Sequence, residues 1–181
     1  MASINEFLTI DVTKGVARPD CIFKGKTYRI TILSDVLVRL EYNENGVFND
    51  YPTIFAINRN FGIKPNFEVK QDNKFINITN DYFILEYNKE KPFIASKLMP
   101  DSNLRITLNG TDKIWYVNNP EVKNLKASTY SFDYKSNFSL ERGLYSLDGF
   151  DSFDDTSRPV FVSDGTVKKN PSDGLDIYVF L

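Results

Sequence analysis

The chain has 181 residues, of which 41% are hydrophobic and 25% charged, the composition of an ordinary globular protein long enough to bury a core. Its formal net charge is -2 with acidic and basic residues interspersed, so it lacks the clustered basic surface that nucleic acids and anionic membranes attract. It has no histidine and a single cysteine, Cys21, which excludes histidine-based catalysis, histidine-based metal binding and an intrachain disulfide.

The chain begins Met-Ala-Ser-Ile-Asn-Glu-Phe, which contains neither a positively charged stretch nor an apolar core, so no signal peptide is expected. No window of the sequence approaches the run of about 20 apolar residues that a membrane-spanning helix requires. With one cysteine and no secretion signal, we expect a cytoplasmic protein. We expect no metal site and no cofactor.

The first predicted elements form a β-hairpin. Residues 27–33 are rich in β-branched and aromatic side chains, and Ser34-Asp35 provides a tight connection to residues 36–42. In the second segment Arg39 and Glu41 alternate with apolar or aromatic residues at Val36, Val38, Leu40 and Tyr42. This period of two predicts a half-buried strand, with Arg39 and Glu41 on the face opposite the apolar side chains.

Further strand-like runs follow at a spacing of roughly ten residues, separated by turn-forming clusters such as Asn-Gly-Thr at 109–111. They cover residues 53–57, 66–70, 75–79, 82–87, 93–98, 104–108, 114–117 and 175–181. No long segment has the apolar spacing of a helix. The pattern predicts an all-β fold, a β-sandwich of two packed, mainly antiparallel sheets.

Residues 119–174 are less regular and hold much of the Gly, Asp and Ser. A loop-rich segment of that length usually has a functional or interface role. The sequence ends within the apolar run 175–181. We therefore expect residues 1–181 to be a single β-sandwich domain, truncated before a further domain.

The densest acidic cluster, from Asp148 to Asp155, is the main candidate for chemistry. Two carboxylates can flank a glycosidic bond as acid and nucleophile or as acid and base. The neighbours Asp154 and Asp155 would point in opposite directions on an extended chain, however, and the alternate-residue spacing of an EF-hand calcium loop is absent. Turn-forming aspartates that cap backbone N–H groups, or a contact with a neighbouring domain or ligand, stay open as interpretations.

Five segments, taken in chain order, have sequences that can be compared with those of a known protein family. Residues 29–42 read RITILSDVLVRLEY, residues 48–53 read FNDYPT before Asn58-Arg59, and residues 124–133 read NLKASTYSFD. Residues 141–150 read ERGLYSLDGF before DDT at 154–156, and residues 176–180 read DIYVF. In this order they resemble segments of the N-terminal domain of glycoside hydrolase family 31, the α-glucosidase and α-xylosidase family. Departures include Tyr51 and Leu147, where the family usually has Arg, and Ser128, where it has Gly.

The resemblance implies a galactose-mutarotase-like β-sandwich that packs against a catalytic (β/α)₈ barrel following residue 181. In the family both catalytic aspartates belong to the barrel, so no catalytic residue is carried over to this chain. The sandwich braces the barrel and sends a loop to the rim of its active site, for which Asp148, Gly149, Asp154 and Asp155 are the candidates. The parent enzyme would hydrolyse α-glucosides or α-linked oligosaccharides, whereas this chain alone would be inactive.

Without its barrel such a domain would expose apolar side chains, and the expected contributors lie in residues 144–153 and 177–181. Self-association of the chain would follow. The fold that the resemblance implies suggests two other functions. The first is an aldose mutarotase, but these enzymes use a His acid with a Glu base, and the absence of histidine argues strongly against this function. A free-standing carbohydrate-binding module would need an exposed aromatic platform, for which Trp115 with Tyr116 is the candidate. Adjacent strand residues face opposite ways, however, so we expect one of the two to pack in the core.

Overall fold

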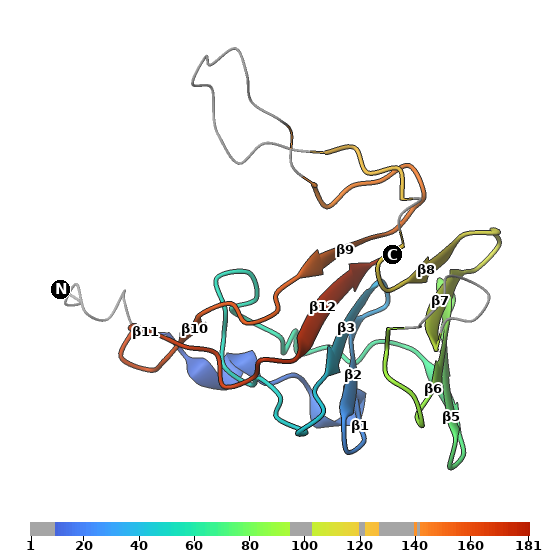
Figure 1. The fold of residues 1–181 in the computed structure, drawn as a ribbon. Helices are drawn as coiled ribbons and strands as arrows, with labels where there is room; N and C mark the ends of the chain where they lie inside the picture. Colours follow the sequence, from blue (N-terminus) through green and yellow to red (C-terminus); the bar gives the residue numbers. More distant parts are fainter. Residues whose placement is uncertain (1–9, 95–102, 120–121, 127–139, 141) are drawn as a thin grey trace. The chain divides into compact units, whose positions relative to one another are not determined.

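A computed structural model describes residues 10–94, 103–119, 122–126, 140 and 142–181. The chain divides into two compact units, which we call the first unit (residues 1–66 and 154–178) and the second unit (residues 67–153 and 179–181). The described residues form two large antiparallel sheets of five strands each, a two-stranded sheet and two short 3₁₀ helices (Figure 1). The predicted all-β class, with the two large sheets of a β-sandwich, is confirmed.

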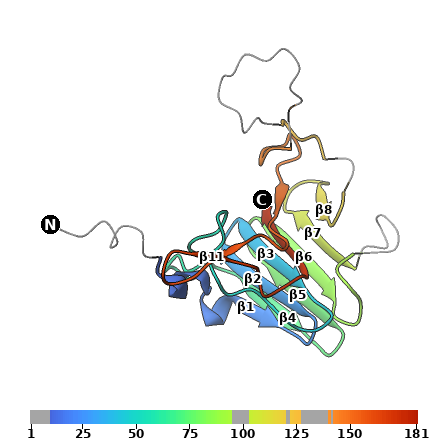
Figure 2. The ribbon, with the colours of Figure 1, turned by 60° about the vertical axis from the view of Figure 1, so that its left-hand side comes forward.

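The first large sheet has the strand order β1-β2-β3-β12-β9. Its strands are β1 (Ile22–Lys24), β2 (Tyr28–Ser34), β3 (Leu37–Tyr42), β9 (Asp151–Asp154) and β12 (Leu175–Phe180). Two 3₁₀ helices, η1 (Val12–Gly15) and η2 (Pro19–Cys21), precede β1, which lies beside β2 and β3 in Figure 2. A separate pair, β10 (Val160–Phe161) and β11 (Val167–Lys168), forms the two-stranded sheet.

The predicted β-hairpin is confirmed, with β2 and β3 paired antiparallel so that Ile30 faces Leu40 and Ile32 faces Val38. These four side chains are buried on one face, as the period of two predicts. The prediction of a half-buried strand is wrong for the other face, because Arg39 and Glu41 are also buried. They stay inside because each is ion-paired with an oppositely charged side chain, which compensates for the loss of water.

The second unit contains the other large sheet, an antiparallel meander in the order β4-β5-β6-β7-β8. Its strands are β4 (Glu68–Gln71), β5 (Phe75–Thr79), β6 (Phe83–Asn88), β7 (Leu104–Leu108) and β8 (Ile114–Tyr116). Buried and more exposed positions alternate along β5 and β6, and Ile78, Leu85, Ile106 and Trp115 lie opposite one another across neighbouring strands. These side chains are buried and form one apolar layer of the unit.

Some predicted strands do not form. In residues 53–57 only Thr53 takes part in a β-bridge, with Val160. Thr53 and Ala56 instead close a turn, in which Thr53 N donates to Ala56 O at 3.1 Å and Ala56 N donates to Thr53 Oγ1 at 3.0 Å. Side-chain hydrogen bonds of this kind compete with strand pairing. Phe93 and Ile94 are not in a strand, and residues 95–98 of that prediction lie outside the described residues.

Only some of the apolar residues that were expected to be exposed are exposed. Leu144, Tyr145 and Leu147 are exposed, whereas Phe150 is buried and Phe153 is half-buried. In the last strand Ile177, Tyr178 and Val179 are buried, because β12 is an inner strand of its sheet. Exposed apolar surface in this part of the sequence is therefore provided by residues 144–147 and not by the final strand.

Candidate binding pocket at Asp148

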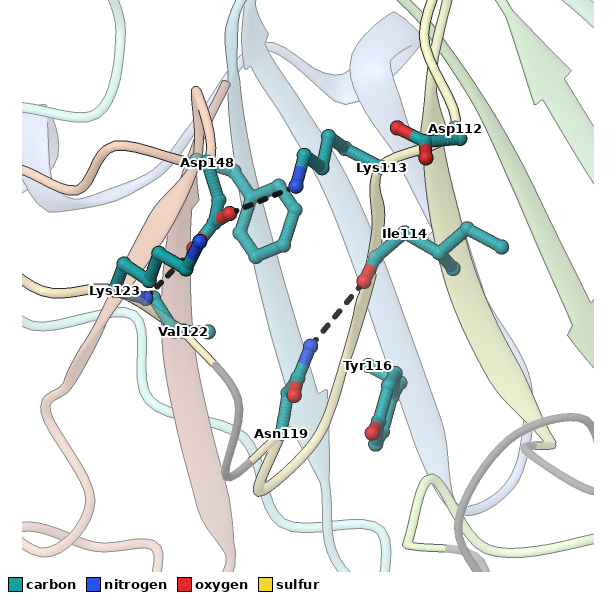
Figure 3. A pocket seen from close by; sticks show the side chains of 9 residues that line it. Asp112, Lys113, Ile114, Tyr116, Asn119, Val122, Lys123 and Asp148 are labelled. Atoms are coloured by element: carbon teal, nitrogen blue, oxygen red, sulfur yellow. Dashed lines mark hydrogen bonds and ion pairs between the residues drawn. The ribbon is translucent and has the colours of Figure 1, made fainter.

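The second unit contains a pocket of about 570 Å³ next to the carboxylate of Asp148 (Figure 3). We call it the Asp148 pocket. Its lining combines acidic, basic, amide, aromatic and aliphatic side chains: Asp112, Lys113, Ile114, Tyr116, Asn119, Val122, Lys123, Asp148 and Phe150. A volume in the range of about 300–1,000 Å³ is typical of small-molecule sites.

One wall of the pocket is made by β8 and the turn before it. Alternation along the strand turns Trp115 into the apolar core, where its exposed fraction is 2%, while Ile114 and Tyr116 line the pocket. Trp115 therefore packs in the core, as expected for one of these two neighbours, and does not form the aromatic platform that a carbohydrate-binding module would need. Tyr116 is buried as well, but it contributes to the pocket wall.

The opposite wall comes from two segments that pair with each other, residues 122–126 and 142–148, which we call the paired arm (Figure 1). Asn124 forms an antiparallel bridge with Ser146, Leu125 N donates to Tyr145 O at 2.8 Å, and Leu147 N donates to Lys123 O at 3.0 Å. The Asn124 side chain adds bonds of its own, accepting from Gly143 N at 3.0 Å and donating to Gly143 O at 2.7 Å.

Asp151 anchors the base of the paired arm. Its buried carboxylate accepts from Arg142 Nε at 3.0 Å and Nη2 at 2.5 Å, and also from the Asn124 amide. It accepts from the backbone N–H of Ser152 at 2.7 Å as well. Asp151, Arg142 and Asn124 were not predicted individually as site residues, because nothing in the local sequence pattern distinguishes Asp151 from the other aspartates of the cluster.

The Asp148 carboxylate links the two walls of the pocket. Oδ1 accepts from Lys113 Nζ at 3.0 Å and Oδ2 accepts from the backbone N–H of Lys123 at 2.6 Å (Figure 3). The hydrogen bond from Lys123 N, followed by that from Lys113, lowers the pKa of Asp148 below its usual value. The same contact with Asp148 raises the pKa of Lys113. Both groups are therefore charged at neutral pH.

Gly149 lets the chain turn directly after Asp148. Its φ is +78°, in the left-handed region that glycine adopts at little cost, and a Cβ at this position would lie 3.2 Å from Leu108 Cδ2. Ser146 supports the same turn, donating from Oγ to Phe150 O at 2.5 Å and accepting from Asp148 N at 3.1 Å. The turn fixes the Asp148 carboxylate in the pocket.

The other two candidate residues belong to the first unit and have different surroundings. Asp154 is exposed and accepts from Thr156 N at 2.9 Å, which is the turn-capping interaction considered for this cluster. Asp155 is buried, accepts from Thr53 Oγ1 at 2.7 Å, and has Arg158 Nε 3.7 Å from its Oδ1. Burial raises the pKa of Asp155. The four candidates are thus divided between two compact units.

A buried polar network occupies the first unit. Arg29 donates to both oxygens of Glu41 at 2.6 and 2.8 Å, Arg39 donates to both oxygens of Asp176 at 2.8 and 2.6 Å, and both guanidinium groups donate to Asn49 O. Burial raises the pKa of Glu41. The pKa of Arg39 is raised despite burial, because Glu41 and Asp176 stabilise its charged form. These mutual contacts indicate a structural role.

Among the described residues no group of three or more Cys, Asp or Glu is arranged to hold a metal ion. In the same part of the chain no helix is both long and apolar enough to cross a membrane. No protein-family model matches the sequence, and no curated protein matches it either.

Proposed function

We propose that this chain is a non-catalytic N-terminal β-domain of a glycoside hydrolase that acts on α-glucosides, and that its paired arm contributes to the rim of the active site. The observation that carries the proposal is the pairing of residues 124–125 with residues 145–146. Both segments belong to the stretches that resemble glycoside hydrolase family 31. Because the two segments resemble one family and also pair with each other, they support the proposal that they form one functional element.

The surroundings of the carboxylates support a non-catalytic role. A general acid in glycoside hydrolysis needs a raised pKa, but the pKa of Asp148 is lowered by Lys123 N and Lys113. Asp155 has a raised pKa, but it is buried and hydrogen-bonded to Thr53. Asp154 caps a turn. Neither Asp148 nor Asp155 therefore combines the raised pKa of a general acid with access to a sugar.

The exposed apolar side chains of the paired arm support a bracing role against a catalytic barrel. Leu125, Tyr145 and Leu147 have exposed fractions of 55%, 78% and 70%. Large apolar side chains gathered at one surface are typical of a contact with another protein surface. The alternative function, a free-standing carbohydrate-binding module, would require an aromatic platform, which Trp115 cannot supply from the core.

An activity assay of the chain by itself tests the non-catalytic part of the proposal. We expect no release of p-nitrophenol from p-nitrophenyl α-glucoside above a buffer blank. Release that disappears in Asp148→Asn or Asp155→Asn, but persists in the control variant Asp164→Asn, would contradict it. Asp164 is a suitable control because it caps an exposed turn by accepting from Thr166 N at 2.9 Å.

Sequencing the natural gene beyond the Leu181 codon tests the enzyme-domain part of the proposal. The reading frame that continues after the Leu181 codon should encode a (β/α)₈ barrel, with an acidic residue at the end of a barrel strand in a W-x-D-M-N-E-like sequence. A stop codon at this point in the natural gene, or an unrelated downstream domain, would overturn the proposal.

A further inference from the structure

We infer that the Asp148 pocket is a binding site for one ring of a neutral sugar, held by charge-assisted hydrogen bonds to its hydroxyl groups. The inference concerns the second unit alone and follows from the chemistry of the pocket lining. It rests on the proposed function in one respect, the choice of α-glucosides as the first ligands to test.

The charges of the pocket argue against an ionic ligand of either sign. Asp112 and Asp148 line it together with Lys113 and Lys123, so acidic and basic groups are equal in number among the described lining residues. An anion bound to the lysines would lie close to the Asp148 carboxylate, and a cation bound to that carboxylate would lie close to Lys113. A ligand without charge avoids both repulsions.

The same groups match the hydrogen-bonding properties of hydroxyl groups, which donate and accept. Among the described residues, each oxygen of Asp148 accepts one bond, at 3.0 Å from Lys113 Nζ and at 2.6 Å from Lys123 N, while a carboxylate oxygen can accept two. Lys113 Nζ can donate three bonds, of which one goes to Asp148. Carboxylate and ammonium thus present an acceptor and a donor side by side, which suits two neighbouring hydroxyls of a sugar ring.

Pre-organisation strengthens this match. The Asp148 side chain is only 8% exposed, its position is fixed from both walls, and the turn at Gly149 holds its backbone. A fixed carboxylate does not have to give up conformational freedom when a ligand binds. Val122, Tyr116 and Phe150 are the apolar and aromatic lining residues against which the C–H groups of a pyranose can pack.

The experiment is a titration of the ¹⁵N-labelled chain with methyl α-glucoside, methyl β-glucoside, methyl α-galactoside and sodium phosphate, followed by NMR. We expect saturable shifts of the Lys123 and Gly149 amide signals with a sugar, since these amides flank the Asp148 carboxylate. Calorimetry on the same samples gives the affinity.

Two lysine variants test the pocket, and a third lysine variant is their control. Lys113→Met and Lys123→Met remove ammonium groups that line the pocket, and each should weaken the sugar about tenfold or more, the value of a charged hydrogen bond. Lys123→Met keeps the backbone N–H that holds Asp148, so its effect does not depend on loss of the turn. Lys126→Met changes an exposed lysine on the same arm outside the pocket, and it should bind as the unchanged chain does.

The outcomes separate the two proposals. Absence of shifts with all three sugars, tighter binding of phosphate, or equal weakening by Lys126→Met and Lys113→Met would each overturn the sugar site. Such a result leaves the reading-frame test of the enzyme-domain proposal unaffected. Preferred binding of the β-glucoside or the galactoside at Lys123 and Gly149 would instead support the sugar site and contradict the proposed specificity for α-glucosides.

Discussion

Arg39, Glu41 and Asp176 show how charged residues can occupy the interior of the first unit. Their side chains are 3%, 4% and 5% exposed, and the shortest nitrogen–oxygen distances from Arg39 are 2.6 Å to Asp176 and 3.1 Å to Glu41. Removing charged groups from water is costly, and the ion pairs offset that cost only while both partners are present. The loss of a single partner should therefore have a large effect.

We expect Arg39→Met to lower the free energy of unfolding by about 3–5 kcal/mol, because Asp176 would remain buried without its main partner. Arg105→Met is the matched control, since the pair of Arg105 with Glu86 has the same length of 2.6 Å but side chains that are 36% and 38% exposed. An exposed pair is worth less than about 1 kcal/mol. Urea unfolding of both variants measures the difference, and equal losses would refute the structural role of the network.

Asp148 shows what sequence can and cannot predict about a site residue. An Asp-Gly pair within an acidic cluster indicates a turn and a candidate ligand-binding position, and the structure has Asp148 in a pocket lining. Its role is determined by Lys123 and Lys113, which are 25 and 35 residues away in the sequence. Contacts of that separation depend on tertiary folding and leave no local pattern. For the same reason the division of Asp148 and Asp155 between two units could not be predicted.

At the scale of elements, strands with regular alternation are predictable and turns with local side-chain hydrogen bonds are not. The predicted ranges 75–79 and 104–108 coincide with β5 and β7, because burial on one face imposes the period of two directly on the sequence. Residues 53–57 are also apolar and β-branched, but the reciprocal bonds of Thr53 and Ala56 close a turn. The strands β10 and β11 have two residues each, which is too short for any period to appear.

The turn after Asp148 allows a prediction at this scale. Gly149 and Gly110 have similar φ values, +78° and +72°, but a Cβ at Gly149 would approach Leu108 whereas a Cβ at Gly110 would meet nothing within 4 Å. Both alanine substitutions should lower stability by about 1–2 kcal/mol through backbone strain. Gly149→Ala should cost more, because Leu108 must also move. Urea unfolding measures both, and a smaller loss for Gly149→Ala than for Gly110→Ala would contradict this account of the turn.

At the scale of the whole molecule, the exposed apolar side chains of the paired arm are the feature that bears on association with other proteins. The bridge between Asn124 and Ser146 places Leu125 opposite Tyr145, and opposite residues in an antiparallel pair project to the same face. Leu147, two residues from Tyr145, projects to that face as well. Leu125, Tyr145 and Leu147 therefore form a contiguous apolar surface, which we call the arm patch. A surface of this kind favours association with another protein surface or with a second copy of the chain.

We expect the chain to self-associate through the arm patch when no other domain covers it. In sedimentation velocity the average mass should rise with protein concentration, and the double variant Tyr145→Ser/Leu147→Ser should remain monomeric over the same range. The control is Ile54→Ser/Ile63→Ser in the first unit, because these side chains are equally exposed, at 71% and 81%, but lie nine positions apart on a single segment without a paired neighbour strand. This control should associate as the unchanged chain does. Two results would show that the arm patch is not a contact surface. One is that the unchanged chain stays monomeric, and the other is that only the Ile54/Ile63 variant loses association.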